Sequence, residues 1–559
     1  MTQQSRRNFL KTSAIGGASA ALGDSALAAP QATKKNAMDH VVLVIFENRS
    51  FDNILGHLYT PGEVPKFEGV IGKNLSNPVP SWAQYPAPNG RVPYGPATYM
   101  DGPNPDSGEE HPHTNTQLYN ILDDRNRFKM ASQMSAPYNA PESSLVRPTM
   151  DGFVTDYISF YTAEMGRQPT YQEYSQIMTG YTPEQIPVIS GLAKGFSCFD
   201  HWYSEVPSQT FTNRSFWTAA TSSGFVVNDP STNFLFKNTA ETIFNRLEAH
   251  GKTWKIYVCE PNPISFTGLV NMPSLKKYFK THIVPFSEYE KDCANGTLPD
   301  FCLIEPNLLA AHNDYHPAFG RALIQGMDLP IDPPSSILGG EAFLTRIYNA
   351  YKGMGTTQAG SNVLNTTLFI GWDEPGGTYD HVAPPLVPAP DPSVPKGQQG
   401  FDFRRSGYRV PAVMISPWIP EKTVFTKEFR HTSMIASLRK AWNLGKPFTA
   451  RDANARTLES CFTLTTPRDP STWPTPVARP VPEYKAPELN NLPPAYSGLA
   501  KAMIPGVVKF SHAEGYPTPS MPKDPNGPIT PKQGIKIALE LAAEMFPQLA
   551  QKGNIKSQY

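Results

Sequence analysis

The chain has 559 residues, with 49 basic and 49 acidic side chains, so its formal net charge is zero. A neutral chain offers no basic surface for a polyanion, which argues against a nucleic-acid-binding protein. Its 58 prolines and 40 glycines together stay below the roughly 25–30% that marks a low-complexity chain, so we expect a globular protein with long, proline-rich loops.

The first 28 residues have the pattern of a twin-arginine export signal. Arg6-Arg7 precedes a weakly apolar stretch of small residues, and Ala26-Leu27-Ala28 forms a cleavage site. The apolar stretch, residues 12–22, is shorter than the roughly 20 residues that cross a bilayer, and no later segment reaches that length. We therefore predict a soluble periplasmic or secreted protein that begins near Ala29 and has no stable membrane anchor.

Short apolar runs alternate with helical patterns along the rest of the chain. This alternation predicts an α/β fold with a mostly parallel central sheet flanked by helices, with long loop insertions. The predicted strands are Val41–Phe46, Thr253–Val258, Phe301–Ile304, Thr367–Gly371 and Pro411–Ser416. The predicted helices are Glu241–His250, Glu341–Tyr351 and Thr432–Trp442, the last capped by Thr432 or Ser433, with a further helix opening near Thr114.

Composition divides the mature chain into a catalytic domain at 38–460 and a proline-rich extension at 461–559. Within them Tyr59–Pro105 and Thr463–Pro517 are rich in proline and predict surface loops, and Pro531–Phe546 predicts a terminal amphipathic helix. None of the five cysteines forms a Cys-x-x-Cys pair, so a zinc knuckle is not indicated. Cys293 and Cys302 are close enough in sequence to form a disulfide after export, or to remain buried thiols.

Two of the predicted strands end in oxygen-bearing side chains. The strand 41–46 is followed by Glu47-Asn48, and the strand 367–371 is followed by Asp373-Glu374 and two glycines. Adjacent carboxylates repel each other unless a cation lies between them. Ligands of parallel sheets bind at the carboxyl ends of the strands, so a cation site is one interpretation, and a capped turn or an acidic surface turn is the other.

The residues from Glu47 to Asp52 read Glu-Asn-Arg-Ser-Phe-Asp, and residues 373–382 combine Asp-Glu, Gly-Gly and Asp-His-Val. Both motifs resemble those of a bacterial phosphoesterase family that contains phospholipases C and acid phosphatases. The resemblance implies an alkaline-phosphatase-like fold and a divalent metal ion held by Glu47, Asn48, Asp373 and Glu374. Oxygen ligands favour Ca²⁺, Mg²⁺ or Mn²⁺, and added histidines would permit Zn²⁺ or Fe.

A third segment, residues 206–214, is similar to the family's nucleophile motif, Gly-Pro-Thr/Ser-x-Pro-Asn-Arg. Alignment on Asn213-Arg214 makes Thr210 the nucleophile, while Ser208 and Thr212 remain alternatives because this chain departs from the motif at both of its prolines. A metal ion would activate the hydroxyl. The resemblance also makes Asn213 and Arg214 candidates to bind phosphate oxygens, Arg214 by a two-pronged contact.

Four histidines complete the set of candidates. His316, in an Asn-Asp-x-His-Pro pattern, and His113 are candidates to stabilise the transferred phosphoryl group or to protonate the leaving alkoxide. His381 is a candidate to support the carboxylate motif from behind, and His431 marks the start of a helix.

These features predict a secreted phosphoric ester hydrolase that uses a divalent cation and a threonine nucleophile. The substrate is a small phosphoester or a phospholipid head group, either a diester, as for a phospholipase C, or a monoester, as for an acid phosphatase. A sulfatase is disfavoured because neither a cysteine nor a serine begins a Cys/Ser-x-Pro-x-Arg sequence. A secreted binding protein on a decayed hydrolase scaffold is the remaining alternative, and the intact carboxylate set argues against it.

Overall fold

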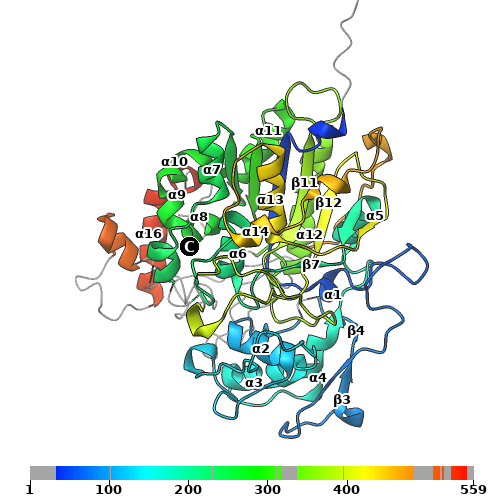
Figure 1. Cartoon of the computed structure of the whole chain (residues 1–559), viewed down its shortest axis with the longest axis vertical. Helices are drawn as coiled ribbons and strands as arrows, with labels where there is room; N and C mark the ends of the chain where they lie inside the picture. The colour runs from blue at the N-terminus through cyan, green and yellow to red at the C-terminus, as the bar shows by residue number, and fades with distance from the viewer. Residues whose placement is uncertain are drawn as a thin grey trace, which may run out of the picture. The chain divides into compact units, whose positions relative to one another are not determined.

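The computed structural model describes residues 33–100, 102–228, 231–260, 262–308, 312–317, 336–393, 396–481, 506, 508–516, 519–520 and 531–550. Their centre is an eight-stranded sheet in the order β13-β6-β12-β11-β1-β10-β8-β9 (Figure 1). Neighbouring strands are parallel except for β12, which runs antiparallel to both β11 and β6. The strands are β1 (His40–Phe46), β6 (Ser197–Phe199), β8 (Trp254–Val258), β9 (Ile283–Pro285), β10 (Phe301–Glu305), β11 (Thr366–Trp372), β12 (Ala412–Ile415) and β13 (Thr423–Phe425). The predicted α/β class with a mostly parallel sheet is confirmed.

The five predicted strands are all present, and no end is shifted by more than one residue. The two central strands, β1 and β11, are almost wholly buried, which explains why their sequences are continuous apolar runs rather than alternating ones. The short strands β6, β9 and β13 were not predicted, because three residues are too few to show a pattern.

Helices cover both faces of the sheet. On one face, Trp217 of α6 (Thr210–Ala219) packs on Phe369 of β11. Trp372 points to the other face, where it contacts Tyr315, and the Tyr315 hydroxyl donates to Glu341 of α12 (Ser336–Gly353) at 2.7 Å. Both sides of β11 are therefore buried against helices.

The observed helices correct several predicted boundaries. The helix predicted at 241–250 is α7 (Ile243–Ala249), capped by Thr242. The one predicted to start at Thr432 or Ser433 is α13 (His431–Ala441), with Arg430 as its N-cap, and the one predicted near Thr114 is α2 (His111–Tyr119). The other helices are α1 (Phe51–Ile54), α3 (Phe153–Met165), α4 (Tyr171–Ser175), α5 (Pro187–Gly195), α8 (Phe266–Val270), α9 (Met272–Leu275), α10 (Phe279–His282), α11 (Phe286–Asn295), α14 (Ala450–Ala453), α16 (Pro531–Met545) and α17 (Pro547–Ala550).

The segment predicted as one loop at 59–105 contains short strands. β2 (Ser76–Pro78) pairs with β3 (Arg91–Pro93), and β4 (Gly95–Pro96) pairs with β5 (Thr179–Gly180), which belongs to a distant part of the sequence. A third small pair joins β7 (Trp202–Tyr203) to β14 (Phe429–Arg430). In the lower part of Figure 1, β3 and β4 accompany α2, α3 and α4.

All five cysteines are buried free thiols, so Cys293 and Cys302 do not form a disulfide here. The predicted terminal helix is α16, and α17 follows it, with Phe546 stacked on Phe279 of α10. Much of the predicted loop 463–517 lies outside the described residues, as does the predicted signal peptide; the domain boundary at 460 remains a prediction.

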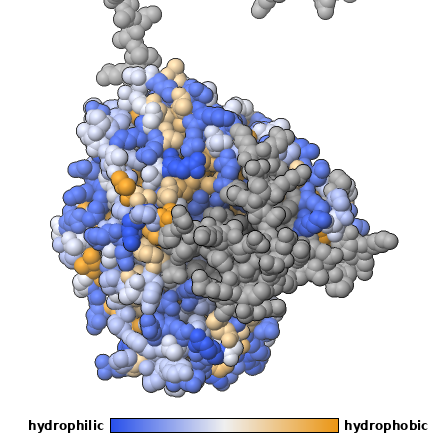
Figure 2. All heavy atoms as spheres, turned by 180° about the vertical axis from the view of Figure 1, so that it is seen from behind, coloured by the Kyte–Doolittle hydropathy of each residue, from blue (hydrophilic) through white to orange (hydrophobic). Residues whose placement is uncertain are grey.

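Figure 2 shows one face as mainly hydrophilic with small separate apolar patches. Among the described residues, we find no helix with the length and apolar character needed to cross a membrane.

Candidate active site

The carboxyl ends of β1 and β11 bring the two carboxylate motifs together. In the parallel register Phe46 lies opposite Trp372, so the residues that follow each strand are neighbours. The Asp373 N–H donates to the Phe46 carbonyl at 3.0 Å, and the Asn48 N–H donates to Asp373 Oδ1 at 3.2 Å. Glu47, Asn48, Asp373 and Glu374 are each no more than 1% exposed. The four predicted ligands therefore share one buried site.

The Gly-Gly pair after Glu374 is required by the close approach of the two motifs. Gly376 and Gly377 both have positive φ angles, 61° and 65°, which glycine adopts without strain. A Cβ atom on Gly376 would lie 2.3 Å from the Asn48 carbonyl oxygen, and one on Gly377 would lie 2.4 Å from Ser107 Oγ. Only glycine fits where these loops meet.

Thr210 is the first residue of α6, with its side chain toward Glu47. Its Oγ1 lies 3.4 Å from Glu47 Oε2. Of the two alternative hydroxyls, Thr212 Oγ1 donates to the Phe225 carbonyl at 2.9 Å on a different side of the helix turn, whereas Ser208 Oγ is buried without a partner. The geometry thus places Thr210 beside a predicted ligand.

Arg214, one helical turn after Thr210, lies between the carboxylates of the two motifs. Its Nη2 and Nε donate to Glu47 Oε1 at 2.6 and 2.9 Å, and Nε lies 3.3 Å from Asp373 Oδ2. Burial would lower the pKa of the guanidinium, but the charges of Glu47 and Asp373 raise it above its usual range. Its Nη1 is buried and has no partner, so one N–H edge stays available to another group.

Asn213 is predicted to bind substrate, but its side chain is bonded to its own loop. Its Oδ1 accepts from the backbone N–H groups of Glu205 and Val206, at 2.9 and 3.0 Å. Its Nδ2 donates to the carbonyls of Val206, Ser208 and Gln209. These bonds fix the loop that leads into α6 and leave no side-chain group of Asn213 directed to a ligand.

The two predicted catalytic histidines occupy different places. His316 lies in the site, where its Nε2 is 2.9 Å from Asn48 Nδ2. His113 is bonded to Asp156 at 2.9 Å and packs edge-on against Phe160. Its Nε2 is buried without a hydrogen-bond partner, and the charge of Glu109 is near enough to contribute to raising its pKa. Burial lowers the pKa of His316 to about 4, so its ring is neutral at neutral pH.

Glu109 is a member of the site that the motifs did not predict. Its side chain accepts from Asn48 Nδ2, and its Oε1 accepts from Gln209 Nε2 at 3.2 Å. Burial, followed by the nearby charge of Glu110, raises the pKa of Glu109 to about 8. In the sequence, only the acidic pair 109–110 directly before a helix pointed to Glu109. Two exposed acidic residues at a helix start would give the same sequence pattern, so the pair does not by itself indicate a buried site.

The electrostatics of the site fit a cation. Burial raises the pKa of Glu47, Asp373 and Glu374, and Arg214 opposes this at Glu47 and Asp373. Neighbouring carboxylates raise these pKa values further: Asp314 acts on Glu47, Glu47 on Asp373, and Glu109 on Glu374. Two buried oxygens, Asn48 Oδ1 and Glu374 Oε1, have no hydrogen-bond partner. Unpartnered buried oxygens among crowded carboxylates are the donor set that a hard divalent cation binds.

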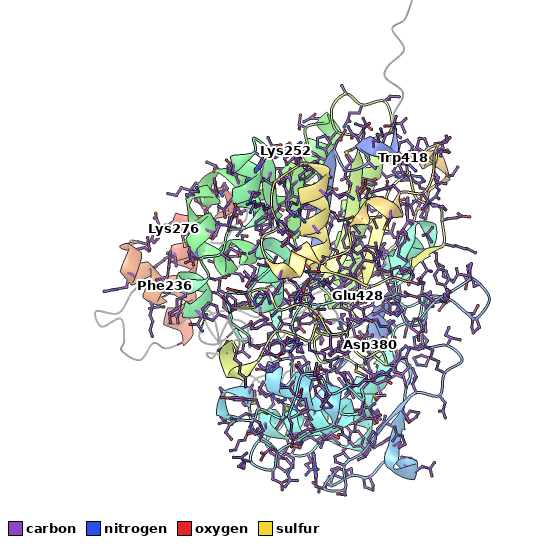
Figure 3. All side chains as sticks on the ribbon, in the orientation of Figure 1. Phe236, Lys252, Lys276, Asp380, Trp418 and Glu428 are labelled. Atoms are coloured by element: carbon purple, nitrogen blue, oxygen red, sulfur yellow. The ribbon has the colours of Figure 1, made fainter. Side chains whose placement is uncertain are left out.

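A second acidic cluster, Asp52, Asp380 and His381, lies behind the site. These side chains are close enough to share a metal ion, but the guanidinium of Arg409 already contacts both carboxylates, at 2.7 Å from Asp52 and 3.0 Å from Asp380. Asp380 is labelled in Figure 3, below the sheet in that view. Arg409 thus neutralises this cluster, and it ties α1 to the loop after β11.

Comparisons with known proteins agree with the site. The model of the Phosphoesterase family matches residues 38–445, and a model of the twin-arginine translocation pathway signal sequence matches residues 3–23. Non-specific phospholipase C3 of Arabidopsis thaliana is 30% identical over 450 residues, which cover 77% of this chain and 74% of the relative. Phospholipase C B of Mycobacterium tuberculosis (strain ATCC 25618 / H37Rv) is 24% identical over 531 residues, with 88% of each covered.

Solved structures give weaker matches. A protein in the alkaline phosphatase superfamily from Vibrio parahaemolyticus is 15% identical, covers 49% of this chain and 64% of its own, and has a TM-score of 0.29, which is too low to support an argument.

A buried carboxylate site at the carboxyl edge of a mostly parallel sheet, with a hydroxyl beside it, is an arrangement suited to the hydrolysis of ester bonds. The chain belongs to the Phosphoesterase family, and it is a hydrolase that acts on phosphoester bonds. Its signal sequence confirms the prediction of export through the twin-arginine pathway.

Proposed function

We propose that the protein is a secreted, metal-dependent phosphoesterase in which Thr210 is the nucleophile. Glu47, Asn48, Asp373 and Glu374 would hold a divalent cation. The observation that carries the proposal is the position of Thr210 Oγ1, 3.4 Å from Glu47 Oε2 in a site with two unpartnered buried oxygens. Bound there, the cation would lower the pKa of a hydroxyl and shield the charge of a phosphate.

The residues of the chain account for the remaining needs of the reaction. The Thr210 hydroxyl gives up its proton as its oxygen bonds to phosphorus, and the bond from phosphorus to the leaving oxygen breaks; the leaving alkoxide takes up one proton, which balances the one lost by Thr210. Water then attacks phosphorus, the bond to the Thr210 oxygen breaks, and the hydroxyl is restored. Thr210 lies at the N-terminus of a ten-residue helix, where the helix dipole favours an anion. The Nη1 of Arg214 has no partner and would donate a hydrogen bond to a phosphate oxygen.

The substrate proposed is a phosphoester, with a phospholipid head group as the favoured class. Two named relatives are phospholipases C, which supports a diester, but the geometry of the site does not distinguish a diester from a monoester. Parallel assays with p-nitrophenyl phosphorylcholine and p-nitrophenyl phosphate measure this preference directly.

The test of the nucleophile compares three hydroxyl variants. Thr210→Ala should reduce turnover at least about a thousandfold while metal content, measured by elemental analysis, stays unchanged. Ser208→Ala and Thr212→Ala are matched controls that should keep most of the activity. If Thr210→Ala remained active and one of the controls did not, the nucleophile would be Ser208 or Thr212. Activity that survives full chelation, with no metal in the protein, would refute metal dependence.

A further inference from the structure

The side-chain amide of Asn48 has its nitrogen held from two directions. One N–H of Nδ2 donates to Glu109 Oε2, and Nδ2 also lies 2.9 Å from Nε2 of His316. His316 Nδ1 lies 2.7 Å from the Pro317 carbonyl, which can only accept, so the Nδ1 atom carries the ring proton. Nε2 is then an acceptor, and both N–H groups of Asn48 are used.

Because the amide nitrogen of Asn48 is held on both sides, the orientation of its oxygen is fixed as well. Asn48 Oδ1 is buried and has no partner, and Glu374 Oε1 shares both properties. A buried amide oxygen without a hydrogen bond is destabilising unless another group pairs with it. The nitrogen contacts therefore orient an oxygen that is ready for a cation.

Glu109 also links this amide to the helix of Thr210. Its second oxygen accepts from Gln209 Nε2 at 3.2 Å, and Gln209 Oε1 accepts from the Asn228 N–H at 3.0 Å. Asn228 Oδ1 in turn accepts from the N–H of Phe211, the residue after Thr210, at 3.0 Å. A single carboxylate thus connects a candidate ligand with the first turn of α6.

We propose that Glu109 is a positioning residue of the cation site, which accepts a hydrogen bond from Asn48 so that Asn48 Oδ1 faces the ion. His316 is the second acceptor of the same amide. The inference rests on the proposed function, because it assigns Asn48 as a ligand. The two oxygens of Glu109 are bonded to Asn48 and Gln209, and its side chain also interacts with Glu374, so Glu109 acts on the site through the candidate ligands.

The test measures Mn²⁺ affinity of the full mature protein by the electron paramagnetic resonance signal of free Mn²⁺. Glu109→Ala should weaken binding about 10–100-fold, the usual effect of losing a partner of a metal ligand. Glu109→Gln keeps a carbonyl acceptor and should bind at least about fivefold more tightly than Glu109→Ala. Glu110→Ala removes a neighbouring carboxyl group and should stay within about twofold of wild type, because the Asn48 amide is bonded to Glu109 and His316 and not to Glu110.

A double-mutant cycle with Asn48→Ala separates positioning from direct binding. In the Asn48→Ala background, Glu109→Ala should change the Mn²⁺ affinity by less than about twofold. A full additional loss in that background, or equal affinities of Glu109→Ala and Glu109→Gln, would overturn the inference and leave the proposed function in place. Wild-type protein that is active but binds no Mn²⁺, Mg²⁺, Ca²⁺ or Zn²⁺ would overturn both. Melting temperatures of all variants identify any that fail to fold.

Discussion

Arg409 provides the sharpest test of how the two carboxylate motifs are held together. Its guanidinium is buried with Asp52 and Asp380, and its Nη1 also donates to the carbonyls of Glu68 and Asp200, both at 2.8 Å. The change Arg409→Met keeps the bulk of the side chain and removes its charge. The carboxylates of Asp52 and Asp380 then lose the guanidinium that they share, and removing one partner of a buried ion pair lowers the free energy of unfolding by about 3–5 kcal/mol.

The expected shift follows from the size of the chain. His381 still contacts Asp52 at 2.6 Å, so we take the lower end, about 3 kcal/mol. For 559 residues at about 2.1 cal/mol/K each, the unfolding entropy is about 1.2 kcal/mol/K, which converts this loss to a melting temperature about 2–3 °C lower. Differential scanning calorimetry of the purified variant measures it, with the exposed Arg404→Met as the matched control.

The loss should depend on pH. Burial already raises the pKa of Asp380 to about 6, whereas the pKa of Asp52 lies below its usual value because Arg409 and His381 outweigh its burial. We expect both pKa values in the folded protein to rise when Arg409 is removed. A carboxyl group whose pKa is raised by folding costs stability as pH rises from the unfolded to the folded pKa, so the deficit should be larger near pH 7.5 than near pH 5. Equal deficits at the two pH values, or none, would refute this account of the network.

Three further predictions concern other parts of the chain. Asn213→Ala should lower the melting temperature and kcat together because the loop before α6 loses its bonds; a lower kcat with an unchanged melting temperature would instead support a substrate contact. A thiol reagent should label no cysteine in the folded protein and five after denaturation, because all five are buried and burial raises the pKa of Cys293 to about 12. Only three labelled thiols after denaturation would show a Cys293–Cys302 disulfide. Burial also raises the pKa of Glu341 to about 7, so the free energy of unfolding should fall as pH rises from about 4.5 to 7. Glu341→Gln should flatten this pH dependence. If the variant had the same pH profile as the wild type, Glu341 would not have the raised pKa.

The fold was predictable where single strands carry their own signal. β1 and β11 are long, apolar and buried on both faces, so their composition marks them as central strands. Strand order was not predictable, because it depends on pairings such as β1 with β10, which join residues more than 250 positions apart. The start of α13 was misplaced for a related reason: Arg430 caps it, a residue type that is not a usual N-cap.

The site was predictable to the extent that its residues lie in short motifs. Glu47, Asn48, Asp373 and Glu374 follow two strands directly, and the parallel register of β1 and β11 then makes their juxtaposition unavoidable. Asn213 shows the limit of a motif, since the sequence gives the residue type but not whether its amide faces the ligand or the loop.

Glu109 shows why the remaining part of the site escaped prediction. It reaches Asn48 from the segment before α2, which no strand of the central sheet positions, so nothing local in its sequence records the contact. The proposed role rests on hydrogen-bonding capacity: an amide with both N–H groups occupied can offer only its oxygen, and Asn48 Oδ1 is buried without a partner. A site of this kind selects its ion through the residues that hold its ligands as well as through the ligands themselves. We therefore expect variants at Glu109 to change metal affinity before they change the fold.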